Sequence, residues 1–301
     1  MHSAKILITG PTGQVAAPIA RALAVENEVW GIARFTDAAA REELEKAGVR
    51  CEKVNLAGGD FSNVPTDFDY VLNLAVAKSG RWDKVLAANA ESVGLLMAHC
   101  RGAKAFLHCS SGAVYDPADD DPRTEETSLG DNHKPIFLTY SISKIAGEVV
   151  VRTMARALDV PAVIARLNVP YGDNGGWPFF QMEMMLSGMP IPVPSGEPAL
   201  YNPIHEDDII AGIPKLLEAA SVPATTVNWG GDQVVSLQEW CEYLGSLVGK
   251  EPIFEESAKA LRGNVLDVSR MHDLIGGTTV DWRDGMRRMA QRFHPELVTG
   301  V

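Results

Sequence analysis

Short apolar runs alternate with amphipathic stretches through the first half of the chain. The apolar runs predict strands at 4–9, 28–33, 50–54, 69–74, 104–110 and 161–166. The intervening stretches have helical periodicity, at 13–25, 38–47, 83–100 and 139–157. Because strands that alternate with helices form parallel sheets covered on both faces, the pattern predicts an α/β protein with a doubly wound parallel sheet.

The pattern changes after residue 170. Five prolines and five glycines occupy residues 172–198, around a helix-like insert at 178–186. A segment at about 225–230 is predicted to return to the main sheet, before helices near 236–248 and 282–292. We therefore predict a sheet domain over 1–170 and a smaller C-terminal substrate-binding lobe over 171–301, placed over the carboxyl ends of the strands.

Residues 116–135 are acidic, contain proline and show no periodicity. We interpret this segment as a solvated surface loop. The alternative is a lid over a site just before Tyr140.

A glycine-containing turn follows the first predicted strand. Lys5–Thr9 is apolar, and Gly10-x-x-Gly13-x-x-Ala16 leads from it into a helix. Small residues at these positions let the backbone turn tightly and approach a pyrophosphate, which helix N–H groups can bind. The alternative is an ordinary strand-to-helix turn that contains glycines.

Tyr140 and Lys144 lie four residues apart in a predicted helix, so their side chains share one face. A neighbouring ammonium favours the phenolate, so we expect Lys144 to lower the pKa of Tyr140 towards neutral pH. Such a phenol can exchange a proton with an alcohol or carbonyl oxygen. The alternative is a solvated lysine on an amphipathic helix.

Several motifs in a fixed order accompany this pair. They are Thr9–Ala16, Val71–Ala75, Asn89 in 88–94, Cys109–Tyr115, Tyr140/Lys144, Arg166–Gly172, Ile204–Asp208 and Leu266–Arg270. With them, the whole chain resembles the extended short-chain dehydrogenase/reductase family, which includes NAD-dependent epimerases and dehydratases. The resemblance implies a Rossmann-type fold, an NAD(P) cofactor and hydride transfer coupled to proton transfer.

The resemblance also implies roles for individual residues. Tyr140 would be the general acid/base, Ser111 would hydrogen-bond the reacting oxygen, and Lys144 would hold the nicotinamide ribose. Asn89 would hold the lysine through water or backbone, although structural capping is an alternative. Neighbours on a strand point to opposite faces, so Ser110 is placed nearer the cofactor.

The predicted cofactor contacts follow the carboxyl ends of the strands. They are Gly10, Thr12, Gly13, Gln14, Val15, Arg34, Asn55, Leu56, Leu74, Ala75, Ala77, Ser110, Tyr140, Lys144, Leu167, Asn168 and Val169. NAD-selective sites place a carboxylate at the end of the second strand, whereas Arg34 stands here. Arg34 can meet a 2′-phosphate, so the sequence favours NADP over NAD. The alternative is an exposed arginine paired with Asp37.

The formal charge of −12 argues against nucleic-acid and anionic-membrane partners. Cys51, Cys100, Cys109 and Cys241 lie in apolar contexts without metal spacing, which indicates reduced thiols in a cytoplasmic protein. We predict no metal, no signal peptide and no membrane span. His108 is interpreted as a strand-core residue, and His133 and His205 as loop residues.

Two departures bear on the substrate. Sugar 4,6-dehydratases need an acidic pair after the catalytic hydroxyl, whereas Gly112 and Ala113 follow Ser111. Nucleotide-sugar members tend to carry an arginine just before 205–208, whereas 200–203 contains no cation. Arg262 and Arg270 are the alternative sources of charge for a diphosphate.

We therefore predict an oxidoreductase acting on a carbonyl or alcohol of a small or moderately apolar molecule. The alternatives are a nucleotide-sugar epimerase with tightly bound NAD and a non-catalytic dinucleotide sensor. Aromatic and methionine residues at 177–185 could line an apolar substrate pocket or form ordinary core. Gly94 and the 139–157 helix fit a homodimer interface, as in related dimers, or an intramolecular core. The sequence leaves the substrate and the reaction direction open.

Overall fold

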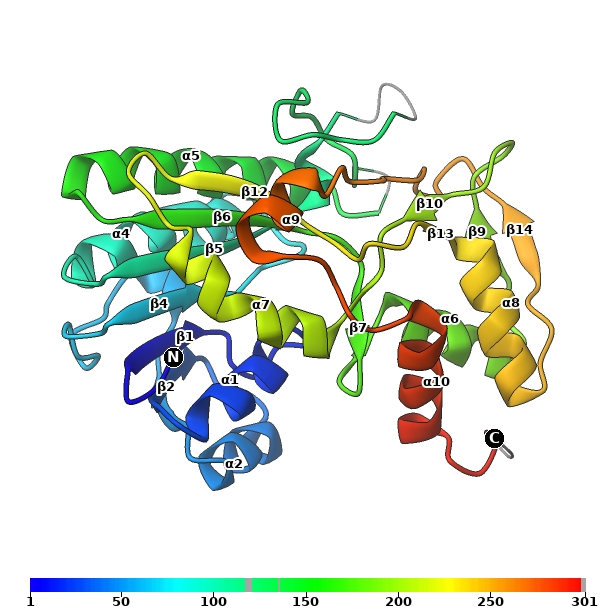
Figure 1. The fold of residues 1–301 in the computed structure, drawn as a ribbon, viewed down its shortest axis with the longest axis horizontal. Helices are drawn as coiled ribbons and strands as arrows, with labels where there is room; N and C mark the ends of the chain where they lie inside the picture. The colour runs from blue at the N-terminus through cyan, green and yellow to red at the C-terminus, as the bar shows by residue number, and fades with distance from the viewer. Residues whose placement is uncertain (117–120, 135, 299–301) are drawn as a thin grey trace.

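The computed structural model describes residues 1–116, 121–134 and 136–298 (Figure 1). Within these residues, seven strands form the central sheet in the order β12-β6-β5-β4-β1-β2-β3. They are β1 (Lys5–Thr9), β2 (Glu28–Ala33), β3 (Arg50–Lys53), β4 (Tyr70–Asn73), β5 (Ala105–Ser111), β6 (Ala162–Leu167) and β12 (Thr225–Trp229). Every neighbouring pair is parallel. The predicted sheet is confirmed, including the late strand that returns beside β6.

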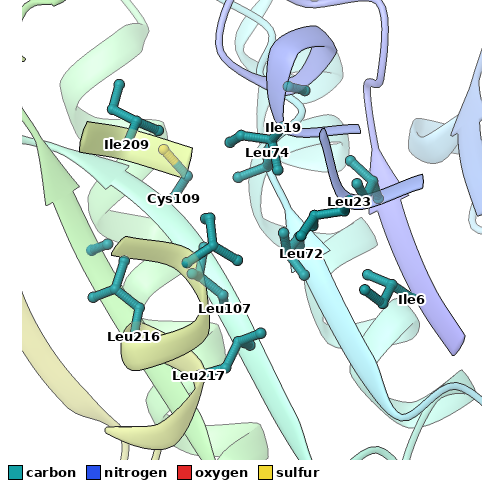
Figure 2. Close-up of a cluster of buried hydrophobic side chains, with 14 of the residues drawn as sticks. Ile6, Ile19, Leu23, Leu72, Leu74, Leu107, Cys109, Ile209, Leu216 and Leu217 are labelled. Carbon is teal, nitrogen blue, oxygen red and sulfur yellow. The ribbon is translucent and has the colours of Figure 1, made fainter. Parts of the chain in front are cut away.

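Helices cover both faces of the sheet. On one face lie α1 (Ala16–Ala24), α2 (Ala38–Lys46), α7 (Glu206–Glu218) and α9 (Ser269–Ile275). Figure 2 shows part of this layer, where Leu72 and Leu107 of the strands face Ile19, Leu23, Leu216 and Leu217 of the helices. The other face, which carries Leu7, Val71 and Phe106, packs against α4 (Ser92–His99) and α5 (Tyr140–Leu158). Strand alternation therefore builds two separate cores.

The predicted helix at 83–100 is interrupted. Its parts are α3 (Trp82–Leu86), the π-helical turn η2 (Ala87–Glu91) and α4. Gly94 packs against α5, since a Cβ there would lie 3.0 Å from Val150 Cγ1. This glycine therefore serves close packing within the chain.

Residues after β6 form a third core on the right of Figure 1, where α6, α8 and α10 lie. Its elements are β7 (Pro170–Gly172), β8 (Gly175–Gly176), α6 (Trp177–Leu186), β9 (Ile191–Val193), β10 (Leu200–Tyr201), β11 (Ile204–His205), β13 (Val235–Ser236), α8 (Leu237–Val248), β14 (Phe254–Glu256) and α10 (Trp282–Phe293). Trp177 meets Tyr201 and Trp240 edge-on within this core. Core packing thus accounts for Trp177, Met182 and Met185, while Phe180 is exposed.

The described part of 116–135 is an irregular loop in which only Arg123 and Asn132 are buried, as the surface-loop prediction expects, and residues 117–120 and 135 lie outside the described residues. Tyr115 bridges Leu129, and the Arg123 backbone bonds Val265 and Asp267. The Glu125 carboxylate accepts from the Asn228 N–H on β12. The segment is anchored because its polar groups complete the bonding at the edge of the sheet.

Candidate active site

The turn after β1 has the geometry that its glycines predict. Gly10 has a φ of +64° and donates its N–H to Ile32 O at 2.9 Å. A Cβ on Gly10 would lie 3.0 Å from Ala75 Cα, and one on Gly13 would lie 3.1 Å from Gly10 O. Side chains would therefore fill this cradle, which leaves backbone at the surface where an anion can approach.

The N-terminus of α1 is open at this cradle. Val15 precedes the helix, no side chain caps it, and the first turn carries no acidic residue. Gln14 Nε2 donates to Pro170 O, and Asn174 Nδ2 donates to Gln14 O, so the turn is tied to the region around β7. An uncapped helix start with a glycine turn suits a pyrophosphate.

Thr9 connects the ends of β1 and β4. Its hydroxyl accepts the N–H groups of Leu74 and Ala75, each at 3.0 Å, and donates to Asn73 Oδ1 at 2.8 Å. Asn73 Nδ2 in turn donates to His108 Nδ1 at 2.8 Å. Thr9, to which the sequence analysis gave no role of its own, therefore places the predicted contacts Leu74 and Ala75 beside the cradle.

The residues that follow β2 and β3 are largely exposed to solvent. Arg34 is exposed and forms no ion pair among the described residues, while Asp37 caps α2 by accepting from Ala40 N. The predicted alternative, pairing of Arg34 with Asp37, is therefore not formed. Asn55 is exposed, Leu56 is half-buried, and a cavity of about 240 Å³ lies beside Asn55.

Tyr140 is the first residue of α5, and its half-buried side chain meets Ser111 at the end of β5. Burial raises the pKa of Tyr140 to about 12, although a side-chain hydrogen bond to Ser111 acts in the opposite direction. The expectation that Lys144 lowers this pKa is wrong for the free protein, because desolvation of the phenolate dominates. At neutral pH the phenol is protonated.

Lys144 is buried one turn further along α5. Its Nζ donates to Cys109 O at 2.5 Å, and burial lowers the pKa of the ammonium against the opposing effects of Cys109 and Glu148. The structure thus brings Ser111, Tyr140 and Lys144 to one end of β5. The lysine is a buried, bonded group, and the solvated alternative is wrong.

Asn89 lies in the π-helical turn beside α5. Its Oδ1 accepts from Ala77 N, and its Nδ2 donates to Ala77 O and Ser143 Oγ, all within 2.9 Å. The Asn89 carbonyl lies against Gly147, where a Cβ would come within 2.6 Å. Asn89 therefore ties the loop of Ala77 to the helix that carries Lys144, and π-turns of this kind are frequent at functional sites.

The Ser110 hydroxyl is bound by a buried carboxylate. It donates to Glu148 Oε1 at 2.6 Å, and Glu148 also binds Arg166 at 2.8 Å and Arg152 at 3.1 Å. Strand alternation turns the Ser110 hydroxyl towards α5, which leaves the backbone of Ser110 for its predicted contact with the cofactor. The buried carboxylate and guanidinium stabilise each other, and Arg166 holds the pKa of Glu148 below its usual range despite burial.

Leu167, Asn168 and Val169 follow β6 at the same edge of the sheet. Leu167 and Asn168 are buried, and Asn168 Nδ2 donates to Asn264 O at 2.7 Å. Val169 has a φ of +24° and accepts from Ile204 N. These residues link the sheet to the later segments.

The three histidines considered in the sequence analysis, His108, His133 and His205, differ in burial and in what they contact. His108 is buried in the core as predicted, whereas His205 is 1% exposed in β11 and caps α7 through Asp207 N, so its loop placement is wrong. His133 packs against the Tyr140 ring with centroids 5.5 Å apart. Its only sequence signal was its position seven residues before Tyr140.

A second cavity, of about 760 Å³, lies at the β12 edge of the sheet. Arg152, Arg166 and Arg270 line it, and each pairs with a glutamate. The described residues contain no cluster of three or more histidine, cysteine or acidic side chains able to hold a metal. No helix in that part of the chain is long and apolar enough to span a bilayer.

The sequence matches the NAD dependent epimerase/dehydratase family over residues 6–230. The chain belongs to this family. The resemblance to extended short-chain dehydrogenases/reductases is thereby confirmed, and with it the Rossmann-type fold. No curated protein matches the sequence.

Solved structures share the fold of this family member over nearly its whole length. The UDP-glucuronic acid 4-epimerase from Bacillus cereus, in complex with UDP-glucuronic acid and NAD, is 21% identical with a TM-score of 0.83, covering 97% of this chain and 99% of that one. The UDP-N-acetylglucosamine 4-epimerase from Methanobrevibacter ruminantium M1 is 16% identical with a TM-score of 0.85, covering 98% and 100%. The dTDP-glucose 4,6-dehydratase from Bacillus anthracis str. Ames is 17% identical with a TM-score of 0.83, covering 97% of each chain.

Proposed function

We propose that this family member is an NAD(P)-dependent oxidoreductase that transfers hydride to or from a carbon bearing a hydroxyl or carbonyl oxygen. The observation that carries the proposal is the placement of Tyr140 beside Ser111, close enough for the serine hydroxyl to act on the pKa of the phenol, with Lys144 buried one helical turn away. A side chain that exchanges a proton with the reacting oxygen typically contributes about 10²–10⁴ in rate.

The residues fit a nicotinamide dinucleotide. The cradle of Gly10 and Gly13 at the open start of α1 would hold the pyrophosphate, and Ala75 and Ala77 would lie along the bound molecule. When bound, the nicotinamide supplies the hydride or accepts it.

The chain's own side chains handle the oxygen and the proton. Ser111 would hold the substrate oxygen by a hydrogen bond, and Tyr140 would pass it a proton. The Tyr140 phenol is protonated at neutral pH, so it can give its proton to a carbonyl oxygen when the reaction runs in the reductive direction. Lys144 would add positive charge beside the phenol as the proton leaves.

We favour NADP as the cofactor because Arg34 is exposed and unpaired among the described residues at the end of β2. The similar epimerase from Bacillus cereus has NAD in its complex, so NAD is the competing choice. The two cofactors differ by one phosphate, for which a free guanidinium is a natural partner.

Nucleotide-sugar epimerisation is the second candidate, and the family together with the similar structures supports it. One feature of this chain opposes it. Tyr201 stands in the segment where nucleotide-sugar enzymes tend to carry an arginine, and its ring is buried between Trp177 and Trp240. Arg270 pairs with Glu125 and Glu126, which leaves the exposed Arg262 as the candidate partner for a diphosphate.

Two measurements test the proposal together. One sample of the purified protein is denatured, and the dinucleotide that it releases is quantified. A second, native sample is assayed at 340 nm with NADP and NAD against a panel of secondary alcohols and ketones. An oxidoreductase releases little dinucleotide and shows net redox turnover. Stoichiometric bound NAD and interconversion of UDP-glucose and UDP-galactose without net redox would establish the epimerase. No turnover of either kind would favour a dinucleotide sensor.

We also propose a homodimer through α4 and α5. Ile142 and Val149 are seven residues apart on one face of α5 and are 39% and 49% exposed, and Leu95 of α4 is 50% exposed. Val149→Glu is expected to shift the protein from dimer to monomer in sedimentation velocity. Val25→Glu, at an exposed position just after α1, is the control. A wild-type protein that sediments as a monomer would contradict the dimer.

A further inference from the structure

Four ionisable side chains follow one another along a single face of α5. Tyr140, Lys144, Glu148 and Arg152 are spaced four residues apart, so each lies about one helical turn beyond the last. They are in turn a phenol, an ammonium, a carboxylate and a guanidinium. Glu148 is fully buried, whereas the Arg152 side chain is 29% exposed. The proposed catalytic pair is therefore the first half of a longer row.

This row of α5 is fastened to the carboxyl end of β5. Three consecutive residues of the strand each meet one residue of the row, and the pairs are Ser111 with Tyr140, Cys109 O with Lys144 Nζ, and Ser110 Oγ with Glu148 Oε1. The last two are hydrogen bonds of 2.5 and 2.6 Å. Glu148 thus belongs to the contact that positions the catalytic pair, although it lies roughly 12 Å along the helix axis from Tyr140.

The Glu148 carboxylate is held by two arginines. Arg166 of β6 donates from Nε and Nη2 to its two oxygens at 3.0 and 2.8 Å, and Arg152 Nη1 donates at 3.1 Å. Burial alone would raise the pKa of Glu148, yet the hydrogen bonds and charge of Arg166, with Ser110 and Arg152, hold it below its usual range. The carboxylate is therefore ionised at neutral pH.

The Lys144 ammonium is buried and bonded to a neutral group. Lys144 is 4% exposed, and its hydrogen bond goes to a carbonyl oxygen. Burial lowers the pKa of Lys144, whereas Cys109 and Glu148 act in the opposite direction. Because burial also raises the pKa of the Cys109 thiol, that thiol is neutral at neutral pH. Glu148 is left as the anion that acts on the ammonium.

The other titratable groups around Lys144 cannot replace this anion. His108 on β5 is neutral, because burial and the charge of Lys144 lower its pKa well below the ordinary value, and the Tyr140 phenol is protonated. On the neighbouring η2, α3 and α4, the titratable residues are exposed or bonded elsewhere, and they are Asp83, Lys84, Glu91 and His99.

We propose that Glu148 is a positioning residue for the proposed reaction and that it acts through Lys144, as the counter-ion of the buried ammonium. Arg166 and Arg152 keep the carboxylate in place, and the carboxylate keeps Lys144 charged. A charged Lys144 stabilises the Tyr140 phenolate that forms as the proton leaves for the carbonyl oxygen. No bond to Glu148 forms or breaks. The inference rests on the proposed function.

The first experiment observes Lys144 directly and needs no substrate. Lysine labelled with ¹³C at Cε is incorporated into the full chain, the Lys144 signal is assigned with Lys144→Met, and its pKa is measured by NMR titration. The double variant Glu148→Leu/Arg166→Met removes the buried ion pair as a unit, which preserves the fold. We expect its Lys144 pKa to be lower than that of the wild type by at least about one pH unit. Loss of the Arg166 cation alone would raise this pKa, so a fall must come from loss of the carboxylate.

Arg152→Met is the matched control, because it removes a cation of the same row and keeps the pair of Glu148 and Arg166. We expect its Lys144 pKa to stay at or above the wild-type value. If the double variant does not fold, Glu148→Gln takes its place, since the amide oxygen can still accept from Ser110. A wild-type Lys144 pKa without the Glu148 charge, or an equal fall in Arg152→Met, would overturn the proposal.

The second experiment measures the consequence for turnover. Reduction of a ketone that the panel identifies is followed as a function of pH for the wild type, the double variant and Arg152→Met. Because a neutral Lys144 cannot stabilise the phenolate, we expect the alkaline fall in kcat to begin at least about one pH unit lower in the double variant alone. An unchanged alkaline limb together with a lower Lys144 pKa would overturn the role of Glu148 in the reaction.

Failure of the proposed function would give a different result. Tyr140→Phe would then retain wild-type turnover, or no member of the panel would react, while the NMR titration would still show whether Glu148 keeps Lys144 charged. A Lys144 pKa that does not depend on Glu148 would contradict this inference alone and would leave the proposed function in place.

Discussion

The residues at the carboxyl ends of β5 and β2, which lie at the two ends of the predicted cofactor site, differ in how many bonding partners they have in the free protein. At the end of β5, the side chains are buried and bonded: Lys144 holds Cys109 O, and Ser110, Glu148 and Arg166 form a closed network behind it. At the end of β2, Arg34 is exposed and has no ion-pair partner among the described residues. The buried residues around Lys144, proposed for the chemical step, are therefore held in place before any ligand binds. Arg34, proposed to select the cofactor, is left in solvent.

This difference separates two kinds of effect. Substitution at the closed end should change stability or the rate of the chemical step, because buried charges depend on fixed partners. Substitution at the open end should change only the relative use of the two cofactors, because an exposed guanidinium contributes little until a phosphate reaches it.

The largest expected effect is at the network behind Lys144. Arg166→Met leaves the buried Glu148 carboxylate without its main partner, so the free energy of unfolding should fall by about 3–5 kcal/mol in urea titrations. The double variant Arg166→Met/Glu148→Leu should recover most of that loss. If the free energy of unfolding of the single variant fell by less than about 1 kcal/mol, the buried pair of Arg166 and Glu148 would not be a fixed, mutually dependent network.

A smaller effect is expected at the open end. Arg34→Ala should raise the KM for NADP about tenfold and leave that for NAD within about twofold, since one charged hydrogen bond is lost. Arg50→Ala, at an exposed arginine already paired with Glu28, is the control. Equal changes in both Michaelis constants would remove the case for NADP.

The smallest effect concerns the pH dependence of stability. Burial, with Lys78 nearby, lowers the pKa of His133 to about 4 in the folded protein, from an ordinary value near 6.5. The unfolded state therefore binds the proton more readily, so this contribution to stability is present above pH 6.5 and is lost as the pH falls towards 4. The melting temperature of His133→Gln should decline less over this range than that of the wild type. The exposed His2→Gln is the control, and a parallel decline in His133→Gln would contradict the assignment.

The sequence predicted the parts of the fold that depend on local periodicity. The predicted strands lie within one residue of their expected bounds and the helices within three, because buried parallel strands are continuous apolar runs. Gly10 and Gly13 were predictable because their positions cannot carry a side chain.

Features that depend on long-range packing were not predictable. The hydrogen bond from Ser110 to Glu148 was not predicted, because Glu148 lies 38 residues away and only the folded sheet brings the two together. The raised pKa of Tyr140 depends on burial by several segments, whereas the sequence showed only the neighbouring charge of Lys144.

The most direct test of the central claim is Tyr140→Phe, which removes one hydroxyl and keeps the ring. Cofactor binding is measured by fluorescence titration, and turnover is measured with any substrate that the panel identifies. We expect the dissociation constant to stay within about threefold and turnover to fall by about 10²–10⁴. Wild-type turnover in this variant would contradict the account, because the Tyr140 hydroxyl would then have no part in proton transfer.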